Sequence, residues 1–374
     1  MKKKIFAFLL SGMMLMGMMP VTAMADTSHT HSVGQDNSQN ETWIAISSLD
    51  GITQDGSYYL TQPVTLNTTW ICDYNVKLCL NGNSITCDAS DSDTIVINND
   101  KTFILTDCQE NAGSVTHSES KTGRGICNNG TFYMYGGNIS GNAVTGPKYS
   151  SEYGKEYKGG GVYNSGTFYM YKGTISSNSV KVNANADEGN YSYGYDYGYG
   201  YDRYYSQFNG GGVYNDGSFT MSGGCILNND ADNDYGGGVY NRNRCELSGS
   251  ALIFNNNARL GGGIYNSGSF TMSGGSINEN HSGGAGGGVL NYTSGTFTMT
   301  GGSITGNKAG GNGGGIMGYS YTQTVTINIS GGTITGNTAD LAGNGIILRG
   351  DTSKTSECAS LKLSGSPDIK DDVF

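Results

Sequence analysis

Three carboxylates lie close together in the run DADND, at Asp230, Asp232 and Asp234. Calcium takes about six to eight oxygen ligands, so this run is a candidate calcium site. The spacing of the glycine triplets described below places Arg259 beside Asp234 and His281 on the same corner. The alternative is a solvated acidic corner in which Asp234 and Arg259 form a surface ion pair worth at most about 1 kcal/mol. We favour the solvated corner and expect no cofactor, with calcium as the alternative.

A second candidate is the tyrosine-rich stretch 190–208, in which tyrosines alternate with Gly, Ser and Asp. Tyrosine combines an apolar ring with a polar hydroxyl and becomes ordered at low entropic cost, so it suits contact surfaces, and sugar rings also stack on its face. The candidate ligand-binding residues are Tyr193, Tyr195, Tyr197, Tyr199 and Tyr201. The alternative, a flexible low-complexity loop without a partner, stays open.

The cysteines and histidines indicate less chemistry. None of the eight cysteines forms a C-x-x-C pair, so no structural zinc site is predicted. An even number in a secreted chain permits disulfides, and the cluster from Cys72 to Cys127 is the place where one is expected. His117 and His281 are isolated, and no nucleophile–base pair can be identified. His29 and His31 are interpreted as part of a mobile polar tail rather than as a metal site.

These residues lie on a chain that repeats itself. A glycine triplet opens a unit at Gly159, Gly210, Gly236, Gly261, Gly286 and Gly313, and the last four intervals are 26, 25, 25 and 27 residues. In one unit, GGGIYNSGSFTMSGGSINEN (Gly261–Asn280), apolar and polar residues alternate in three short runs, which predicts three short strands and no helix. One unit cannot bury its own apolar face, so units must stack. The predicted fold is all-β, a single-stranded right-handed parallel β-helix of triangular cross-section with about 25 residues per coil.

Stacking predicts columns of like residues along the axis. The inward columns are Val162, Val213, Val239, Ile264, Val289 and Ile316; Phe168, Phe219, Cys245, Phe270 and Phe297; Met170, Met221, Leu247, Met272 and Met299; and Ile175, Ile226, Leu252, Ile277, Ile304 and Ile334. A turn ladder of hydrogen-bonded amides is expected at Asn164, Asn215, Asn241, Asn266 and Asn291. An outward column, Tyr163, Tyr214, Tyr240 and Tyr265, is interpreted as a structural stack rather than as a ligand platform.

The chain divides into four segments. Residues 1–25 have a lysine-rich start, an apolar run and an Ala-Met-Ala cleavage site, as a secretory signal peptide does. Residues 26–41 form a polar segment that is expected to be disordered. Residues 42–122 are expected to form an N-terminal cap with irregular first coils, and residues 123–374 the regular repeats.

Two insertions interrupt the repeats, at 143–158 and 180–209. They fall at equivalent positions of their coils, so they should lie on the same corner, where solenoids often bind partners. Charged residues are sparse at 14%, and the net charge of −10 argues against a nucleic-acid partner, since phosphates attract Lys and Arg. No membrane span is expected in the mature chain. These patterns do not determine the oligomeric state.

The repeats GGGVYNSGTFYMYKGTISSN and GGGIYNSGSFTMSGGSINEN, preceded by VKLCLNGNSIT and ILTDC, resemble the right-handed parallel β-helix repeat proteins secreted by Firmicutes. The resemblance covers Tyr58 to the end of the chain and implies an extracellular, adhesin-like protein that can be associated with the cell surface. The expected function is a non-catalytic scaffold that contacts host or bacterial surface glycans or proteins through its tyrosine-rich insertion.

An enzyme is the alternative, because pectate lyases and polygalacturonases are also parallel β-helices. It would be a polysaccharide lyase or glycoside hydrolase centred on the Asp230 corner. The paired-Asp, Gly-His-Gly and Arg-x-Lys motifs of polygalacturonases are absent from the sequence. The sequence therefore favours the non-catalytic scaffold.

Overall fold

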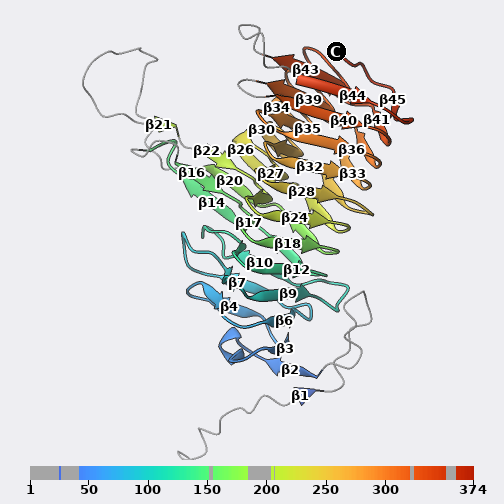
Figure 1. Ribbon diagram of the computed structural model, residues 1–374. Helices are drawn as coiled ribbons and strands as arrows, with labels where there is room; N and C mark the ends of the chain where they lie inside the picture. The colour runs from blue at the N-terminus through green and yellow to red at the C-terminus, as the bar shows by residue number, and fades with distance from the viewer. Residues whose placement is uncertain are drawn as a thin grey trace, which may run out of the picture.

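The computed structural model describes residues 25–26, 42–150, 155–183, 204–205, 207–320, 324–350 and 359–374. In this part of the chain the one helical element is a single 3₁₀ turn, η1 (Leu49–Gly51). Strands of consecutive coils pair in parallel, and the coils rise along one axis from β2 (Trp43–Ile46) to β45 (Asp368–Ile369), the blue and red ends of Figure 1. The predicted all-β parallel β-helix is confirmed.

Several predicted features lie outside the described residues. They are residues 1–24 of the expected signal peptide, residues 27–41 of the polar segment with His29 and His31, Cys358, and the candidate tyrosines Tyr193, Tyr195, Tyr197, Tyr199 and Tyr201. What the sequence predicts for these residues stays a prediction.

Three long sheets surround the main core. Sheet A runs in the order β1 (Ala25–Asp26), β2, β3 (Gly56–Leu60), β6 (Val76–Cys79), β9 (Thr102–Thr106), β12 (Thr131–Met134), β18 (Thr167–Met170), β24 (Ser218–Met221), β28 (Arg244–Leu247), β32 (Ser269–Met272), β36 (Thr296–Met299), β40 (Val325–Ile329) and β44 (Ala359–Leu363). Sheet B runs β4 (Val64–Leu66), β7 (Ile85–Cys87), β10 (Ser114–His117), β13 (Asn138–Ser140), β19 (Thr174–Ser176), β25 (Cys225–Leu227), β29 (Leu252–Phe254), β33 (Ser276–Asn278), β37 (Ser303–Thr305), β41 (Thr333–Thr335) and β45. Sheet C runs β5 (Trp70–Cys72), β8 (Ile95–Ile97), β11 (Ile126–Asn128), β17 (Val162–Asn164), β23 (Val213–Asn215), β27 (Val239–Asn241), β31 (Ile264–Asn266), β35 (Val289–Tyr292), β39 (Ile316–Ser320) and β43 (Ile346–Gly350).

A fourth sheet corrects the triangular cross-section. Sheet D contains β14 (Ala143–Gly146), β20 (Ser179–Val182), β26 (Asp230–Tyr235), β30 (Asn257–Leu260), β34 (His281–Ala285), β38 (Lys308–Ala309) and β42 (Thr338–Ala339). In the same sheet β22 (Gln207–Asn209) pairs with β26, and β16 (Glu156–Lys158) pairs with β22. From β3 to residue 143 the coils contribute to three sheets, as predicted, and from β14 to β42 they contribute to four. The fourth strands are short and rich in Gly, Ala and polar residues, so they lack the apolar alternation by which strands are recognised.

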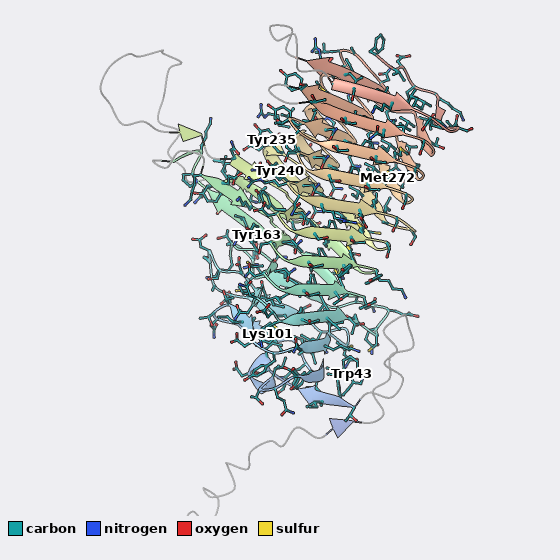
Figure 2. The ribbon with its side chains drawn as sticks, viewed as in Figure 1. Trp43, Lys101, Tyr163, Tyr235, Tyr240 and Met272 are labelled. Atoms are coloured by element: carbon teal, nitrogen blue, oxygen red, sulfur yellow. The ribbon has the colours of Figure 1, made fainter. Side chains whose placement is uncertain are left out.

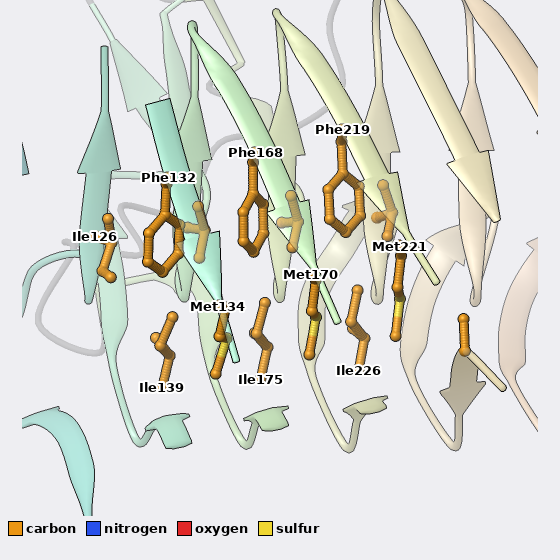
Figure 3. Close-up of a cluster of buried hydrophobic side chains, with 14 of the residues drawn as sticks. Ile126, Phe132, Met134, Ile139, Phe168, Met170, Ile175, Phe219, Met221 and Ile226 are labelled. Carbon is orange, nitrogen blue, oxygen red and sulfur yellow. The ribbon is translucent and has the colours of Figure 1, made fainter. Parts of the chain in front are cut away.

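The predicted inward columns fill the core between sheets A, B and C. Figure 3 shows Phe, Met and Ile side chains of successive coils side by side in rows. The ring centroids of Phe168 and Phe219 are 4.8 Å apart and those of Phe270 and Phe297 are 4.9 Å apart. Cys245 takes the Phe position between Phe219 and Phe270, as predicted, and is buried. Each such buried side chain contributes about 1.5–3 kcal/mol by leaving water.

One residue of the Ile column was predicted wrongly. The register pairs Ile226 with Ile253 and Cys225 with Leu252. Ile253 is therefore the buried member of the column, and Leu252 is only partly buried. Cys225 lies in a different column from Cys245, as expected.

The glycine triplets form the tight corner that leads into sheet C. Gly261 has a φ of +67°, a left-handed conformation that favours glycine. A Cβ atom on Gly262 would lie 2.2 Å from the backbone oxygen of His281 in the next coil. The triplet is therefore required both by a left-handed backbone conformation and by close packing between coils.

Two ladders of buried asparagines run along the axis. The predicted ladder is confirmed, and it begins one coil earlier, at Asn128. In it each Nδ2 donates to the Oδ1 of the next coil over 2.6–2.7 Å. A second ladder, which the sequence analysis missed, consists of Asn142, Asn178, Asn229, Asn256, Asn280, Asn307 and Asn337.

All amides of the second ladder point the same way, with Oδ1 towards the N-terminal coils and Nδ2 towards the C-terminal coils. Each end has a complementary cap. His117 Nδ1 lies 2.8 Å from Asn142 Oδ1, and Asp371 Oδ2 accepts a hydrogen bond from Asn337 Nδ2 over 2.9 Å. The first ladder lacks such a cap within the described residues, where Asn128 Oδ1 is buried without a hydrogen-bond partner.

Candidate functional site

The outer face of sheet A carries an ordered set of tyrosines. The sequence TFYMY occurs in two successive coils, at 131–135 and 167–171. In each, Phe and Met are buried in the core, so the alternation of a strand directs the tyrosines between and after them to the outer face. The register stacks β12 on β18 residue by residue. The result is an array of four partly exposed rings, the tyrosine array: Tyr133, Tyr135, Tyr169 and Tyr171.

The rings of the tyrosine array are parallel. Tyr133 stacks on Tyr169 with centroids 5.0 Å apart, and Tyr135 stacks on Tyr171 at 4.8 Å. Tyr169 and Tyr171 lie side by side, 6.4 Å apart with an interplanar angle of 15°. Because the rings stack along the solenoid axis, Tyr169 and Tyr171 together form one flat aromatic surface, two rings wide, that faces the next coil.

The next coil leaves this aromatic surface uncovered. The register aligns Thr220 with Tyr169, and Ser222 follows at the level of Tyr171. Neither side chain is long enough to cover a tyrosine ring. We call Tyr169, Tyr171, Thr220 and Ser222 the tyrosine ledge. The long tyrosine side chains of one coil project further from sheet A than the short hydroxyl-bearing side chains of the next coil.

A charged pair borders the ledge one coil further on. Glu246 of β28 is aligned with Thr220, and Arg244 Nε donates to Glu246 Oε1 over 3.0 Å. Strands in a sheet are about 4.8 Å apart, so β28 lies about 10 Å from β18 along the axis. A flat ring that stacked on the tyrosines would lie over β24, between β18 and β28. An aromatic wall, a floor of hydroxyls and a guanidinium–carboxylate pair are together suited to a sugar.

A second group of tyrosines is structural. Tyr214, Tyr240 and Tyr265 face away from the main core, as predicted, but sheet D covers them and they form a second buried cluster. Their ring centroids are 4.9 and 4.8 Å apart, and Tyr163 begins the same column. Figure 2 labels Tyr163 and Tyr240 of this column. Arg242 Nη1 donates to the Tyr214 hydroxyl over 3.1 Å. Burial raises the pKa of all three phenols well above the usual value.

The acidic corner lies on sheet D. Asp234 accepts a hydrogen bond from the backbone N–H of Phe208 over 2.7 Å and lies 3.8 Å from Arg259, so the predicted neighbours meet. Asp230 Oδ1 accepts from Asn257 Nδ2 over 2.8 Å, and His281 Nδ1 lies 3.0 Å from Asn257 Oδ1. These contacts are those expected of a solvated corner. The Asp232 side chain lies outside the described residues, so the calcium site stays a prediction.

The two inserted segments meet on one corner, as predicted. β15 (Tyr149–Ser150) pairs antiparallel with β21 (Tyr204–Tyr205), and β16 pairs in parallel with β22. The ends of the segments are structural, because β14 and β20 belong to sheet D. Val180 and Phe208 are buried there in a third small cluster.

The described residues hold one group of three possible metal ligands within reach of a single ion. Cys79 Sγ, Cys108 Sγ and a carboxylate oxygen of Asp107 lie within 4.8 Å of one another. His117 is buried and serves as the cap of the second Asn ladder, with Nε2 2.8 Å from the Ser92 carbonyl oxygen. His281 is exposed and bonded to Asn257.

Comparison with protein-family models, with curated proteins and with solved structures finds no match for this chain. Within the residues that the structure describes, no helix has the length and apolar character needed to cross a membrane.

Sequence reasoning missed the tyrosine array, although its signal was visible. The predicted inward columns include Phe168 and Met170 of the second TFYMY, and no prediction was made for the outward tyrosines of either copy. Applying the same alternation to the other face would have stacked Tyr133 on Tyr169 and Tyr135 on Tyr171, since the period of the repeat was already known.

Proposed function

We propose that this protein is a secreted, non-catalytic, adhesin-like β-helical scaffold that contacts surface glycans. The observation that carries the proposal is the tyrosine ledge. Aromatic ring faces attract the positively polarised C–H groups that a pyranose ring presents on its flat side. A coplanar pair of rings offers two adjacent stacking sites, which suits an oligosaccharide better than a single sugar.

The neighbours of the ledge support the same ligand class. Thr220 and Ser222 supply hydroxyls, and Arg244 and Glu246 supply charged donors and acceptors for sugar hydroxyls. The rigid sheet beneath fixes the spacing of the tyrosines before any ligand arrives, which lowers the entropic cost of binding. The tyrosine-rich insertion, with Tyr193, Tyr195, Tyr197, Tyr199 and Tyr201, is the second candidate contact region.

The proposal is tested by applying residues 26–374 to a glycan array and measuring the dissociation constant of the best ligand. Each stacked ring is worth about 0.5–1.5 kcal/mol. The double variant Tyr169→Ala/Tyr171→Ala should therefore bind about 5- to 150-fold more weakly. Replacing the five loop tyrosines by serine tests the insertion separately and leaves the buried Val180 and Phe208 in place.

The matched control is Tyr74→Ala, which removes a tyrosine that is 37% exposed and lies away from the ledge. It should leave binding unchanged. Absence of any glycan ligand, or equal binding by the ledge variant and the wild type, would contradict the ledge proposal. Release of unsaturated product from acidic polysaccharides in the presence of calcium would contradict the non-catalytic role.

A further inference from the structure

The cysteine pair in the early coils is a site that the glycan proposal does not use. Cys79 ends β6, and Cys108 follows β9, the next strand of sheet A. Their Sγ atoms are 3.6 Å apart, with the Cys79 thiol directed at Cys108. Cys79 is fully buried, and Cys108 is partly exposed.

We infer that Cys79 and Cys108 form a disulfide that joins adjacent coils when the protein meets a low-molecular-weight disulfide. The sulfurs are close enough that side-chain rotation can bring them to the bonding distance of about 2.05 Å, with the backbone already held in register by the β6–β9 ladder. The inference is independent of the glycan proposal.

The chemistry balances with one equivalent of oxidant. The Cys108 thiolate attacks one sulfur of the oxidant R–S–S–R, forms a mixed disulfide and expels R–S⁻. The Cys79 thiol then loses its proton and attacks the Cys108 sulfur, which expels the second R–S⁻. The two protons end on the two R–SH products, so two protein thiols are oxidised while one small disulfide is reduced.

The order of attack follows from exposure. Cys108 is the partly exposed thiol, so the oxidant reaches it first. Cys79 is out of contact with solvent, and burial raises the pKa of its thiol. It is therefore a poor first nucleophile but is already positioned as the resolving thiol.

A metal ion fits the same group less well. The Asp107 carboxylate already accepts hydrogen bonds from the backbone N–H groups of Gly82, Gln109 and Gly113, over 3.0, 3.0 and 2.7 Å. Binding an ion would compete with these bonds and would place a thiolate charge at the buried Cys79. Forming a disulfide removes both thiols without leaving a charge.

Other cysteines of the predicted cluster are directed elsewhere. The Cys72 thiol donates to the Tyr74 carbonyl oxygen over 3.2 Å, and the Cys87 thiol is directed at the Ala89 carbonyl oxygen. The expected bridge in the Cys72–Cys127 cluster is thus assigned to one pair.

The test treats the folded protein with oxidised glutathione, blocks remaining thiols with an alkylating reagent after denaturation, and maps non-reduced peptides by mass spectrometry. The expected result is a peptide pair linked through Cys79 and Cys108, with a mass lower by two hydrogen atoms. The count of titratable thiols should fall by two, from the eight of the full chain. Cys108→Ser should abolish the linked pair, and the matched control Cys225→Ser should retain it.

Three results would overturn the inference. One is retention of all thiols at saturating oxidant, and another is glutathione held on Cys108 with no transfer to Cys79. The third is stoichiometric zinc binding that protects both thiols from the oxidant. Circular dichroism of each variant distinguishes a lost bridge from a lost fold, and the wild-type mapping stands even if Cys108→Ser does not fold.

Discussion

Removing one amide from the middle of the second Asn ladder should destabilise the protein far more than removing an exposed neighbour. Asn256 is buried, and its Oδ1 accepts from both the backbone N–H and the Nδ2 of Asn229, each over 3.0 Å. Its Nδ2 donates to the Ile226 carbonyl oxygen and to Asn280 Oδ1, over 3.0 and 2.9 Å. The side chain thus connects three coils.

The magnitude follows from the groups that Asn256→Ala leaves behind. The backbone N–H of Asn229 loses its acceptor, and the Ile226 carbonyl loses a donor, whereas Asn229 Nδ2 keeps the Ile175 carbonyl. A buried polar group without a partner costs about 1–3 kcal/mol. The two groups together should therefore cost the variant about 2–6 kcal/mol of the free energy of unfolding.

The matched control is Asn257→Ala, which removes the same amide one residue later. Asn257 is exposed, and its hydrogen bonds to Asp230 and His281 lie at the surface. Its loss should change the free energy of unfolding by about 0.5 kcal/mol or less. Both variants are compared by denaturant unfolding, and equal m-values make the two free energies comparable. The hydrogen-exchange rate of the Asn229 backbone amide measures the lost bond directly.

Equal destabilisation by Asn256→Ala and Asn257→Ala would refute the reasoning. So would an unchanged exchange rate at Asn229, because that amide has Asn256 Oδ1 as its acceptor. Either outcome would mean that the hydrogen bonds of the ladder are a consequence of the packing of the coils and contribute little to the free energy of unfolding.

The remaining predictions concern the cap of the ladder and the buried tyrosines. His117→Leu removes the ring nitrogens that face Asn142 Oδ1 and the Ser92 carbonyl, so the free energy of unfolding should fall by about 1–3 kcal/mol. His117→Asn keeps a side-chain amide donor at this position and should lose less, and equal losses in urea unfolding would argue against a capping role. The alkaline limit of stability should be set by Tyr240 and Tyr265, whose phenol pKa values are raised by burial. The unfolded chain releases these protons near pH 10 and the folded chain does not, so their contribution is complete below about pH 10 and is lost as the pH rises above it. In an alkaline titration the last rise in tyrosinate absorbance, from the buried phenols, should accompany the loss of the circular dichroism signal. Ionisation of all tyrosines near pH 10 with the fold intact would contradict this.

The period of the repeat made most of the core predictable. A triplet of glycines every 25 to 27 residues aligns like side chains. An error of a single residue would have turned the Phe column towards solvent, because alternate residues of a strand face opposite sides. This is why Cys245 could be assigned to a Phe position without a structure. The one slip, Leu252 for Ile253, arose where two apolar residues are adjacent and both fit the pattern. The second Asn ladder would have decided it, because its asparagine follows the inward isoleucine by three residues, as in Ile226 and Asn229 or Ile253 and Asn256.

Sheet D and the tyrosine ledge were less accessible to sequence reasoning, for different reasons. Strands such as Lys308–Ala309 contain too few residues to show an alternation, and their pairing is imposed by the coils on either side. The ledge depends on a difference between coils: Tyr169 matters because Thr220 follows it in register. Looking for likeness between repeats finds the core, whereas a contact surface is found where neighbouring repeats differ.

The register across the glycine corners also makes length a modular property of this molecule. Tyr235 and Leu260 are aligned partners in sheet D, and Gly236 and Gly261 begin equivalent turns with φ of +71° and +67°. Excising residues 236–260 would join two chain ends that already occupy corresponding places, and every column would close over the gap. A solenoid built in this way can gain or lose whole coils. A surface site formed by coils outside the changed region would keep its geometry, and only its distance from the first coil would change.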